Sequence, residues 1–373
     1  MIDEQSMFPQ HIRSLKPYVP GLPMEQVARR LNLPVAKIAK LASNENPLGA
    51  SPLALRALAE QQRIDWSRYP DADCADLTQA LAAHLDVPAD WVVAGAGSES
   101  VLGMVASMLL APGRTAVYSQ YSFQAFVNAA QRVGATSRVV PSPGFTVDLK
   151  GLADAIEPAT SLIYIANPGN PTGTWLEPAA LEAFLERVPA RVAVLLDEAY
   201  REYMAPVRRG DSLAWLRRHP NLIVTRTFSK AYGLAGLRVG YGIAQPRFAD
   251  VMRRLRAPFS VTQSAQLAAA AALADTEFLR RTAEANRYGL AQLGAALQRM
   301  GIEALPSSGN FLLARVGDGA DMAQRLQRHG LIVRPVANYG LAEWVRLSVG
   351  RTEENARLIA ALEAELPEPA AKS

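Results

Sequence analysis

Residues 227–238 read TFSKAYGLAGLR, directly after an apolar run that predicts a buried strand. The stretch places one lysine, two hydroxyl side chains and one arginine among small and apolar residues. A lysine that burial deprives of water has a lowered pKa, and its neutral amine attacks aldehydes. We therefore expect Lys230 to act as a nucleophile. A phosphate group on the aldehyde would be bound by Thr227, Ser229 and Arg238.

The composition is that of a folded globular protein with room for one large core and a smaller lobe. The chain has 373 residues, of which 49% are hydrophobic and 20% are charged. Its net charge of +4 includes no block of basic residues, so we expect no nucleic-acid partner. One cysteine and four scattered histidines provide neither a disulfide framework nor metal-ligand spacing, so we expect no metal. No signal peptide or apolar span of roughly 18–20 residues is visible, so we expect a cytoplasmic location and no membrane partner.

Strand-like and helix-like segments alternate along most of the chain. Between most of the apolar, β-branched runs lie longer segments rich in Ala, Leu, Glu and Arg. This alternation predicts an α/β fold whose mostly parallel, seven-stranded sheet is sandwiched by helices. The predicted strands are residues 91–93, 115–118, 138–140, 162–166, 192–196, 222–227 and 239–243.

A smaller α+β domain is predicted after a long helix at about residues 278–300. Strands are expected there at residues 311–315, 331–334 and 345–349, with two further helices. The expected division is 1–45 for an N-terminal arm and part of the small domain, 46–275 for the large domain, and 276–373 for the small C-terminal domain.

Polar motifs follow several predicted strands, at the edge of the sheet where ligands bind in open α/β folds. Residues 95–100 read GAGSES and open a helix, whose free N–H groups suit a phosphate. Residues 167–173 read NPGNPTG, and residues 197–200 read DEAY after a buried run. An acid at the mouth of a buried strand needs a partner, such as a protonated pyridine nitrogen. Tight turns and helix capping by Asp197 remain the alternatives for these motifs.

Together the motifs supply what pyridoxal 5'-phosphate (PLP) needs. They offer a lysine for the aldehyde, an anion for the ring nitrogen, donors for the ring oxygen, a stacking aromatic side chain and a phosphate cup. In this combination the chain resembles the fold type I PLP-dependent aminotransferases of the aspartate aminotransferase superfamily. The resemblance covers nearly the whole sequence. It implies PLP as the cofactor and a PLP-binding role for the large domain.

The resemblance also implies a role for each matching residue. Lys230 would bind the cofactor and move a proton, Asp197 would keep the ring nitrogen protonated, and Tyr200 would complete the catalytic set. Tyr69 resembles a tyrosine that reaches the phosphate from a neighbouring subunit, which implies a homodimer. The other implied cofactor contacts are Asn170 and Tyr200 at the ring oxygen, Phe123 stacked on the ring, Ser98 and Glu99 through backbone N–H groups, and Thr227, Ser229 and Arg238 at the phosphate. Phe123 alone fits a core aromatic equally well.

A narrower resemblance is to the histidinol-phosphate aminotransferase family. It rests on KPYVPG at 16–21, LASNENP at 41–47, and VRP at 333–335 followed by NYG at 338–340. It implies amino transfer between histidinol phosphate and 2-oxoglutarate, which yields imidazole-acetol phosphate and glutamate. Two arginines suit a dianionic phosphate ester better than one. The implied substrate contacts are Tyr18, Asn46, Arg334 and Arg346.

Three positions depart from the family pattern, and other functions stay open. Gly169 stands where Asn is common, Glu99-Ser100 replaces Asn/Asp-Glu, and Tyr121 replaces Pro.

Aminotransferases that act on phenylalanine or tyrosine share these motifs, and decarboxylation of a phosphorylated amino acid is a more distant alternative. A PLP-binding regulator without turnover and an unrelated phosphate-binding α/β protein are two further ones. The sequence does not rank imidazole against benzyl side chains.

Overall fold

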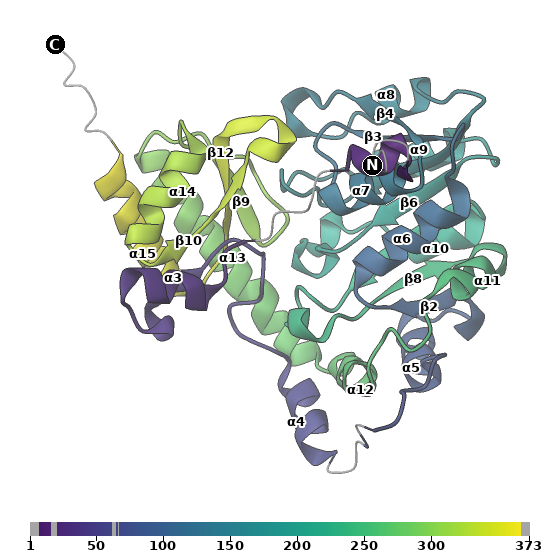
Figure 1. Ribbon diagram of the computed structural model, residues 1–373, viewed down its shortest axis with the longest axis horizontal. Coiled ribbons are helices and arrows are strands. Elements are labelled where there is room, and N and C mark those ends of the chain that lie inside the picture. Colours follow the sequence, from purple (N-terminus) through teal and green to yellow (C-terminus); the bar gives the residue numbers. More distant parts are fainter. Residues whose placement is uncertain (1–6, 16–20, 62–64, 66, 367–373) are drawn as a thin grey trace.

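The computed structural model describes residues 7–15, 21–61, 65 and 67–366, which form a large and a smaller domain (Figure 1). The large domain is built on a seven-stranded sheet with the strand order β2-β8-β7-β6-β5-β3-β4. β8 runs antiparallel to both of its neighbours, and the other pairs are parallel, which confirms the predicted mostly parallel sheet. The strands are β2 (Val92–Gly95), β3 (Thr115–Ser119), β4 (Thr136–Val140), β5 (Thr160–Ala166), β6 (Ala193–Asp197), β7 (Leu222–Thr227) and β8 (Gly240–Ala244).

The central strands are apolar along their length because helices cover both faces of the sheet. Successive residues of β5 point to opposite faces: Leu162 and Tyr164 pack in one core, and Ile163 and Ile165 pack in the other. Helices α6, α7 and α11 cover the first core, and most of the others cover the second. The helices of this domain are α4 (Pro52–Glu60), α5 (Ala75–Leu85), α6 (Ser98–Leu109), α7 (Gln124–Arg132), α8 (Leu149–Asp154), α9 (Pro178–Arg187), α10 (Ser212–Arg218), α11 (Pro246–Leu255) and α12 (Gln263–Ala272).

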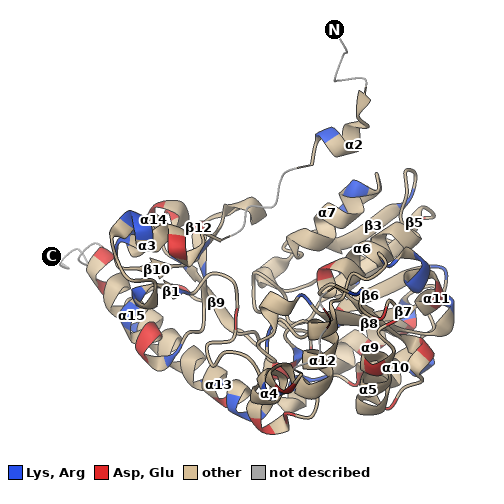
Figure 2. Cartoon of the chain, turned by 60° about the horizontal axis from the view of Figure 1, so that its bottom comes forward, with Lys and Arg blue, Asp and Glu red and all other residues tan. Residues whose placement is uncertain are grey.

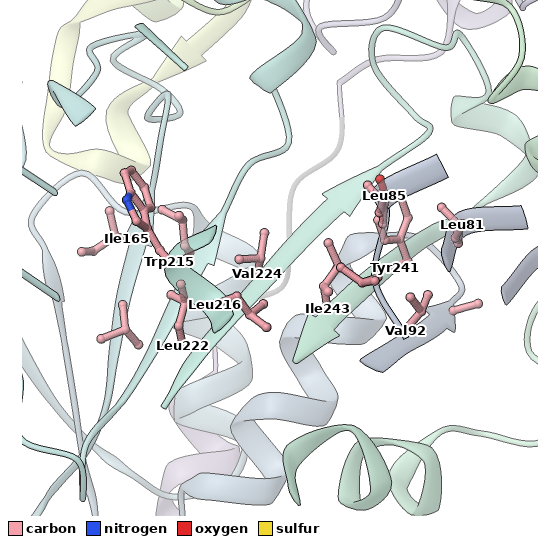
Figure 3. Packing of buried hydrophobic residues seen from close by; sticks show 14 of the residues in the cluster. Leu81, Leu85, Val92, Ile165, Trp215, Leu216, Leu222, Val224, Tyr241 and Ile243 are labelled. Carbon is pink, nitrogen blue, oxygen red and sulfur yellow. The ribbon is translucent and has the colours of Figure 1, made fainter. Parts of the chain in front are cut away.

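The second core anchors β7, the strand that leads to Lys230 (Figure 3). Leu222 and Val224 of β7 are completely buried in the same cluster as Trp215 and Leu216 of α10. Burying a side chain of this size contributes roughly 1.5–3 kcal/mol. The loop that follows β7 therefore starts from a rigid position.

The smaller domain combines segments from both ends of the chain (Figure 1). β1 pairs in parallel with β10, so the N-terminal segment is joined to the C-terminal region, and β11, β12 and β9 form an antiparallel sheet. Its strands are β1 (Ala39–Lys40), β9 (Phe311–Arg315), β10 (Leu331–Ile332), β11 (Arg334–Val336) and β12 (Leu341–Ser348). The remaining helices are α2 (Gln10–Arg13), which lies against α7, and α3 (Met24–Leu31), α13 (Thr276–Arg299), α14 (Gly319–Arg328) and α15 (Thr352–Glu365).

Two strands of the smaller domain differ from the sequence-based expectation. The predicted strand at 331–334 is divided at Val333, because β10 and β11 join different sheets. The strand predicted at 345–349 begins earlier, at Leu341. The exposed Ala342 and Glu343 interrupt the apolar pattern there, so the sequence does not reveal the start of the strand.

Charged side chains lie on both domains, with Lys and Arg interspersed among Asp and Glu (Figure 2). Many of them pair along one helix, as Arg280 does with Glu277 and Glu284. Such exposed pairs each contribute little to stability. In the described parts of the chain, no helix is both long enough and apolar enough to cross a membrane.

Candidate active site

A cavity lies where the carboxyl ends of β5, β6 and β7 face β11 and β12 of the smaller domain. The structure brings together at this cavity nearly all of the residues that the sequence singled out. They are Ser98, Glu99, Phe123, Asn170, Asp197, Tyr200, Thr227, Ser229, Lys230, Arg238, Arg334 and Arg346. These residues come from both domains, so the site exists only where the two meet.

Lys230 projects into the cavity from the loop after β7. Its Nζ donates a hydrogen bond to the backbone oxygen of Ser43, at 3.0 Å. Burial lowers the pKa of Lys230 to about 7, and the positive charge of Arg346 adds to this shift. A large fraction of the amine is therefore neutral near pH 7, as a nucleophile requires.

Asp197 ends β6 and is buried at the floor of the cavity. Its Oδ2 accepts a hydrogen bond from the Tyr164 hydroxyl at 2.9 Å, and its Oδ1 accepts one from the backbone N–H of Ala199 at 3.2 Å. Burial raises the pKa of this carboxyl to about 6, although both hydrogen bonds oppose the shift. The hydrogen bond from the Ala199 N–H is of the kind that caps a helix. It involves only Oδ1, so capping does not account for the position of Oδ2.

Tyr200 and two asparagines form a hydrogen-bonded group beside Lys230. The Tyr200 hydroxyl accepts hydrogen bonds from Asn44 Nδ2 at 2.9 Å and from Asn170 Nδ2 at 3.3 Å. Burial raises the pKa of Tyr200 to about 12, so the phenol stays protonated and can donate to an acceptor in the cavity. Amide and phenol donors placed this way suit a ring oxygen.

The paired arginines lie on adjacent strands. Arg334 of β11 is directly opposite Arg346 of β12, and opposite residues of an antiparallel pair share one face of the sheet. Arg346 Nη1 donates to Asn170 Oδ1, and its Nη2 donates to the backbone oxygen of Ala42, each at 2.6 Å. These contacts aim the guanidinium at the cavity. Two positive charges on one wall create a binding region for a dianion.

A second anion-binding region lies at the start of α6. Gly97 precedes the helix with φ +79°, and a Cβ there would lie 2.6 Å from Arg238 Nη2, so only glycine allows the arginine this close. Arg238 Nη1 donates to Ser229 Oγ at 3.3 Å, and Ser229 N–H donates to Thr227 Oγ1 at 3.1 Å. Ser98 begins the helix, and its free N–H groups lie at the same place. This set fits a phosphate monoester.

Two of the expected site residues, Asn46 and Tyr69, lie away from the cavity, and a third is not described. Asn46 does not line the cavity; its Nδ2 donates to the backbone oxygen of Ala231 at 2.8 Å and to Thr282 Oγ1 at 3.0 Å. The hydrogen bond to Ala231 stabilises the loop that carries Lys230. Tyr69 is 80% exposed and stacks on Phe259, at 4.5 Å between ring centroids, outside the cavity of its own chain. Tyr18 lies outside the described residues.

The sequence did not single out several residues of the site. Asn44 belongs to the LASNENP motif, which was noticed, but only Asn46 was chosen from it. Tyr164 is hidden in the apolar run of β5, and nothing in the sequence distinguishes it from a core residue. Glu45 also lines the cavity. These three residues can be assigned to the site only once the folded structure brings their segments together.

The donor set of the cavity fits PLP. A neutral amine, a buried carboxylate, ring-oxygen donors and a phosphate region are grouped in one cavity, as that cofactor requires. Within residues 7–15, 21–61, 65 and 67–366, no group of three or more His, Cys, Asp or Glu residues is placed to hold a metal ion.

Comparisons with known proteins agree with this geometry. Residues 36–362 match the family model for aminotransferase class I and II. The chain is 53% identical over 362 residues to histidinol-phosphate aminotransferase 2 of Ralstonia nicotianae, with 96% of each chain covered. It is 50% identical over 359 residues to histidinol-phosphate aminotransferase 1 of Cupriavidus pinatubonensis, with 95% of each chain covered.

A solved structure shares the whole fold. The histidinol-phosphate aminotransferase of Sinorhizobium meliloti, solved in complex with pyridoxal-5'-phosphate, is 31% identical and superimposes with a TM-score of 0.86. The match covers 96% of this chain and 97% of that one. The chain therefore belongs to the class I and II aminotransferase family, among its histidinol-phosphate aminotransferase members.

Proposed function

We propose that the protein is a PLP-dependent aminotransferase of histidine biosynthesis. It would transfer an amino group between histidinol phosphate and 2-oxoglutarate, with imidazole-acetol phosphate and glutamate as the products. The observation that carries the proposal is the arginine pair, Arg334 and Arg346, on one wall of the cavity that contains Lys230. We also propose that it acts in the cytoplasm.

The residues of the chain divide the work as follows. Bound PLP supplies an aldehyde that reacts with amines and a cationic ring that withdraws electrons. Lys230 Nζ would hold the cofactor through its aldehyde and would move a proton to or from the reacting carbon of the substrate. The negative charge of Asp197 would hold a proton on the ring nitrogen of the bound cofactor, and the burial of this carboxylate would make the attraction strong.

Two anion-binding regions orient the reactants. The start of α6, with Ser229 and Arg238, would hold the cofactor phosphate and so orient the ring toward Lys230. Arg334 and Arg346 hold the phosphate of the substrate. In the other half of the cycle, the same arginines receive the α-carboxylate of glutamate, which carries one negative charge rather than two. Charge-assisted, bidentate contacts of this kind provide both attraction and orientation.

A side-by-side assay of amino donors tests the substrate. Histidinol phosphate, phenylalanine and tyrosine are each mixed with the PLP-loaded enzyme, and conversion of the cofactor to its amine form is followed by absorbance. We expect histidinol phosphate to react with the highest kcat/KM. Conversion by phenylalanine but not by histidinol phosphate would instead identify an aromatic aminotransferase. Release of carbon dioxide from a phosphorylated amino acid would indicate a decarboxylase.

Arg334→Gln tests the arginine pair. A hydrogen bond to a charged group contributes about 1.5–3 kcal/mol, so we expect kcat/KM for histidinol phosphate to fall by roughly 10- to 150-fold. The loss for glutamate should be smaller because its α-carboxylate, the group proposed to meet these arginines, carries a single negative charge. Arg315→Gln is the matched control, since Arg315 lies exposed on the neighbouring strand β9 and pairs with Glu343 at the surface. Equal losses for both donors would contradict the assignment.

The exposed Tyr69 supports a homodimer. Its ring and that of Phe259 form an aromatic surface in the large domain, and large exposed aromatic groups commonly mark interfaces. In the dimer Tyr69 would reach the cofactor phosphate of the partner subunit. Tyr69→Ala should weaken PLP binding although the side chain lies outside the cavity of its own chain. A monomer in sedimentation that retains full PLP affinity would contradict this.

A further inference from the structure

Glu45 is a carboxylate of the cavity wall that the chemistry described above does not use. Among the described residues, three acids line the cavity: Glu45, Glu99 and Asp197. Asp197 serves the ring nitrogen, and Glu99 lies in the first turn of α6 at the cofactor phosphate. Glu45 follows β1 of the smaller domain and is therefore the acid that remains for the substrate.

The structure holds Glu45 in place while leaving it one oxygen to offer. Its Oε1 accepts a hydrogen bond from Lys40 Nζ at 2.8 Å, and its backbone oxygen accepts one from Asn310 Nδ2 at 3.4 Å. Lys40 belongs to β1, which is paired with β10, so the pair is attached to a rigid element. In the described part of the chain, no hydrogen bond involves Glu45 Oε2. The side chain is 42% exposed, so a ligand in the cavity can reach it.

Glu45 also lies within electrostatic reach of the nucleophile. Its negative charge raises the pKa of Lys230, against the larger lowering by burial and by Arg346. A group in the cavity that is attached to the reacting carbon therefore lies in the field of Glu45. A phosphate is repelled by this carboxylate and attracted by the arginine pair, so the two ends of a substrate are sorted by charge.

The proposed substrate has a group that matches this carboxylate, and the inference rests on that proposed function. With the phosphate on Arg334 and Arg346 and the amine at Lys230, the group still to be placed is an imidazole, which offers an N–H donor. We propose that Glu45 Oε2 accepts this N–H and is the residue that selects imidazole over a phenyl ring. A phenyl ring has no donor, so the carboxylate would lose water without gaining a partner.

Two plainer roles for Glu45 predict a different pattern. If Glu45 acted only on the charge of Lys230, its removal would change the rate with every amino donor equally. If it only stabilised the loop through Lys40, removal would lower the melting temperature and again affect all donors alike. The quantity that separates these roles is therefore the ratio of the kcat/KM values of two amino donors that differ only in the ring.

The experiment compares histidinol phosphate with 2-amino-3-phenylpropyl phosphate, which has the same phosphate and amine. kcat/KM is measured for both donors with the PLP-loaded wild-type enzyme, Glu45→Ala and Glu45→Gln. We expect Glu45→Ala to lower the imidazole-to-phenyl ratio by about 10- to 100-fold, the range for loss of a hydrogen bond to a charged group. Glu45→Gln keeps an acceptor oxygen and should recover part of the ratio.

Binding without turnover gives a second readout. In a Lys230→Ala background, the dissociation constants of both ligands are titrated between pH 5.5 and 8. With Glu45 present, the ratio of the two dissociation constants should favour the imidazole ligand more strongly below about pH 6.5, where the imidazole ring becomes cationic. With Gln at this position the ratio should no longer depend on pH. Because the phenyl ligand carries the same phosphate, the titration of the phosphate affects both dissociation constants and cancels in their ratio.

The outcomes separate this inference from the proposed function. If the wild-type enzyme does not use histidinol phosphate, the proposed function fails. If it does, but the ratio is unchanged in both Glu45 variants, the role of Glu45 is overturned while the function stands. A ratio that changes in Glu99→Gln but not in Glu45→Gln would assign the imidazole to the other carboxylate and equally overturn the inference.

Discussion

Two consecutive carboxylates, Asp197 and Glu198, are both buried at the end of β6 but have opposite surroundings. Asp197 faces the cavity and receives hydrogen bonds from neutral donors, one of them the Tyr164 hydroxyl. Glu198 faces the other side of the sheet, where it forms ion pairs with Arg226 at 2.8 Å and Arg201 at 3.2 Å. One acid is neutralised within the fold, and the other is not.

The difference shows which of the two is available for chemistry. Burying a carboxylate without a cation is costly, and proteins usually pair it. Glu198 follows that rule. Asp197 does not, since burial raises its pKa to about 6 and no Lys or Arg forms an ion pair with it among the described residues. Its natural partner is a cation from outside the chain, such as the protonated ring of PLP.

The largest effect is expected from breaking the ion pair of Glu198. Arg226→Met leaves the carboxylate buried without its closest cation, and such a loss costs about 3–5 kcal/mol in the free energy of unfolding. The double variant Arg226→Met/Glu198→Met should recover most of that loss because neither charge of the buried pair remains, and the partly exposed Arg201 keeps its hydrogen bond to the backbone oxygen of Gly210. Urea denaturation of the cofactor-free protein measures both. If the double variant is as unstable as the single one, the ion pair is not the source of the effect.

A change at Asp197 should act on activity instead of stability. Asp197→Asn keeps the size of the side chain but removes the charge, so kcat/KM should fall by about 10²–10³-fold, as when one preorganised electrostatic contact is lost. The melting temperature of the cofactor-free protein should not fall, because the uncompensated buried charge is gone. A variant with at least a tenth of wild-type activity would show that the proposed function does not depend on this carboxylate.

The smallest expected effect is a pH dependence of the cofactor-free protein. The pKa of Asp197 is about 6 in the fold against an ordinary value of 3.8, so between these pH values the folded chain binds the extra proton. Stability therefore decreases as pH rises from about 4 to 6, by roughly 3 kcal/mol for a shift of this size. Asp197→Asn should lack this component. A wild-type and a variant curve of equal slope would contradict the raised pKa.

Much of the fold was predictable because it depends on local patterns. Every predicted strand of the large sheet overlaps an observed one, since near-continuous apolar runs are required where both faces are buried. The motif after β7 predicted roles for Lys230 and Arg238 for a similar reason. The chemistry proposed for them requires small residues nearby, and these residues are close in the sequence. The early part of β12 was missed where Glu343 is exposed.

The sequence by itself determined the α/β class and singled out the lysine and the carboxylate that we propose for the site, because each is encoded within a short stretch. Only the tertiary structure decided how those stretches meet. The Asn44 backbone N–H donates to Ser348 Oγ across 304 positions, and Arg334 meets Arg346 across a strand pair. Contacts of this kind depend on how segments that are far apart in the sequence pack together, and local residue patterns do not specify that packing.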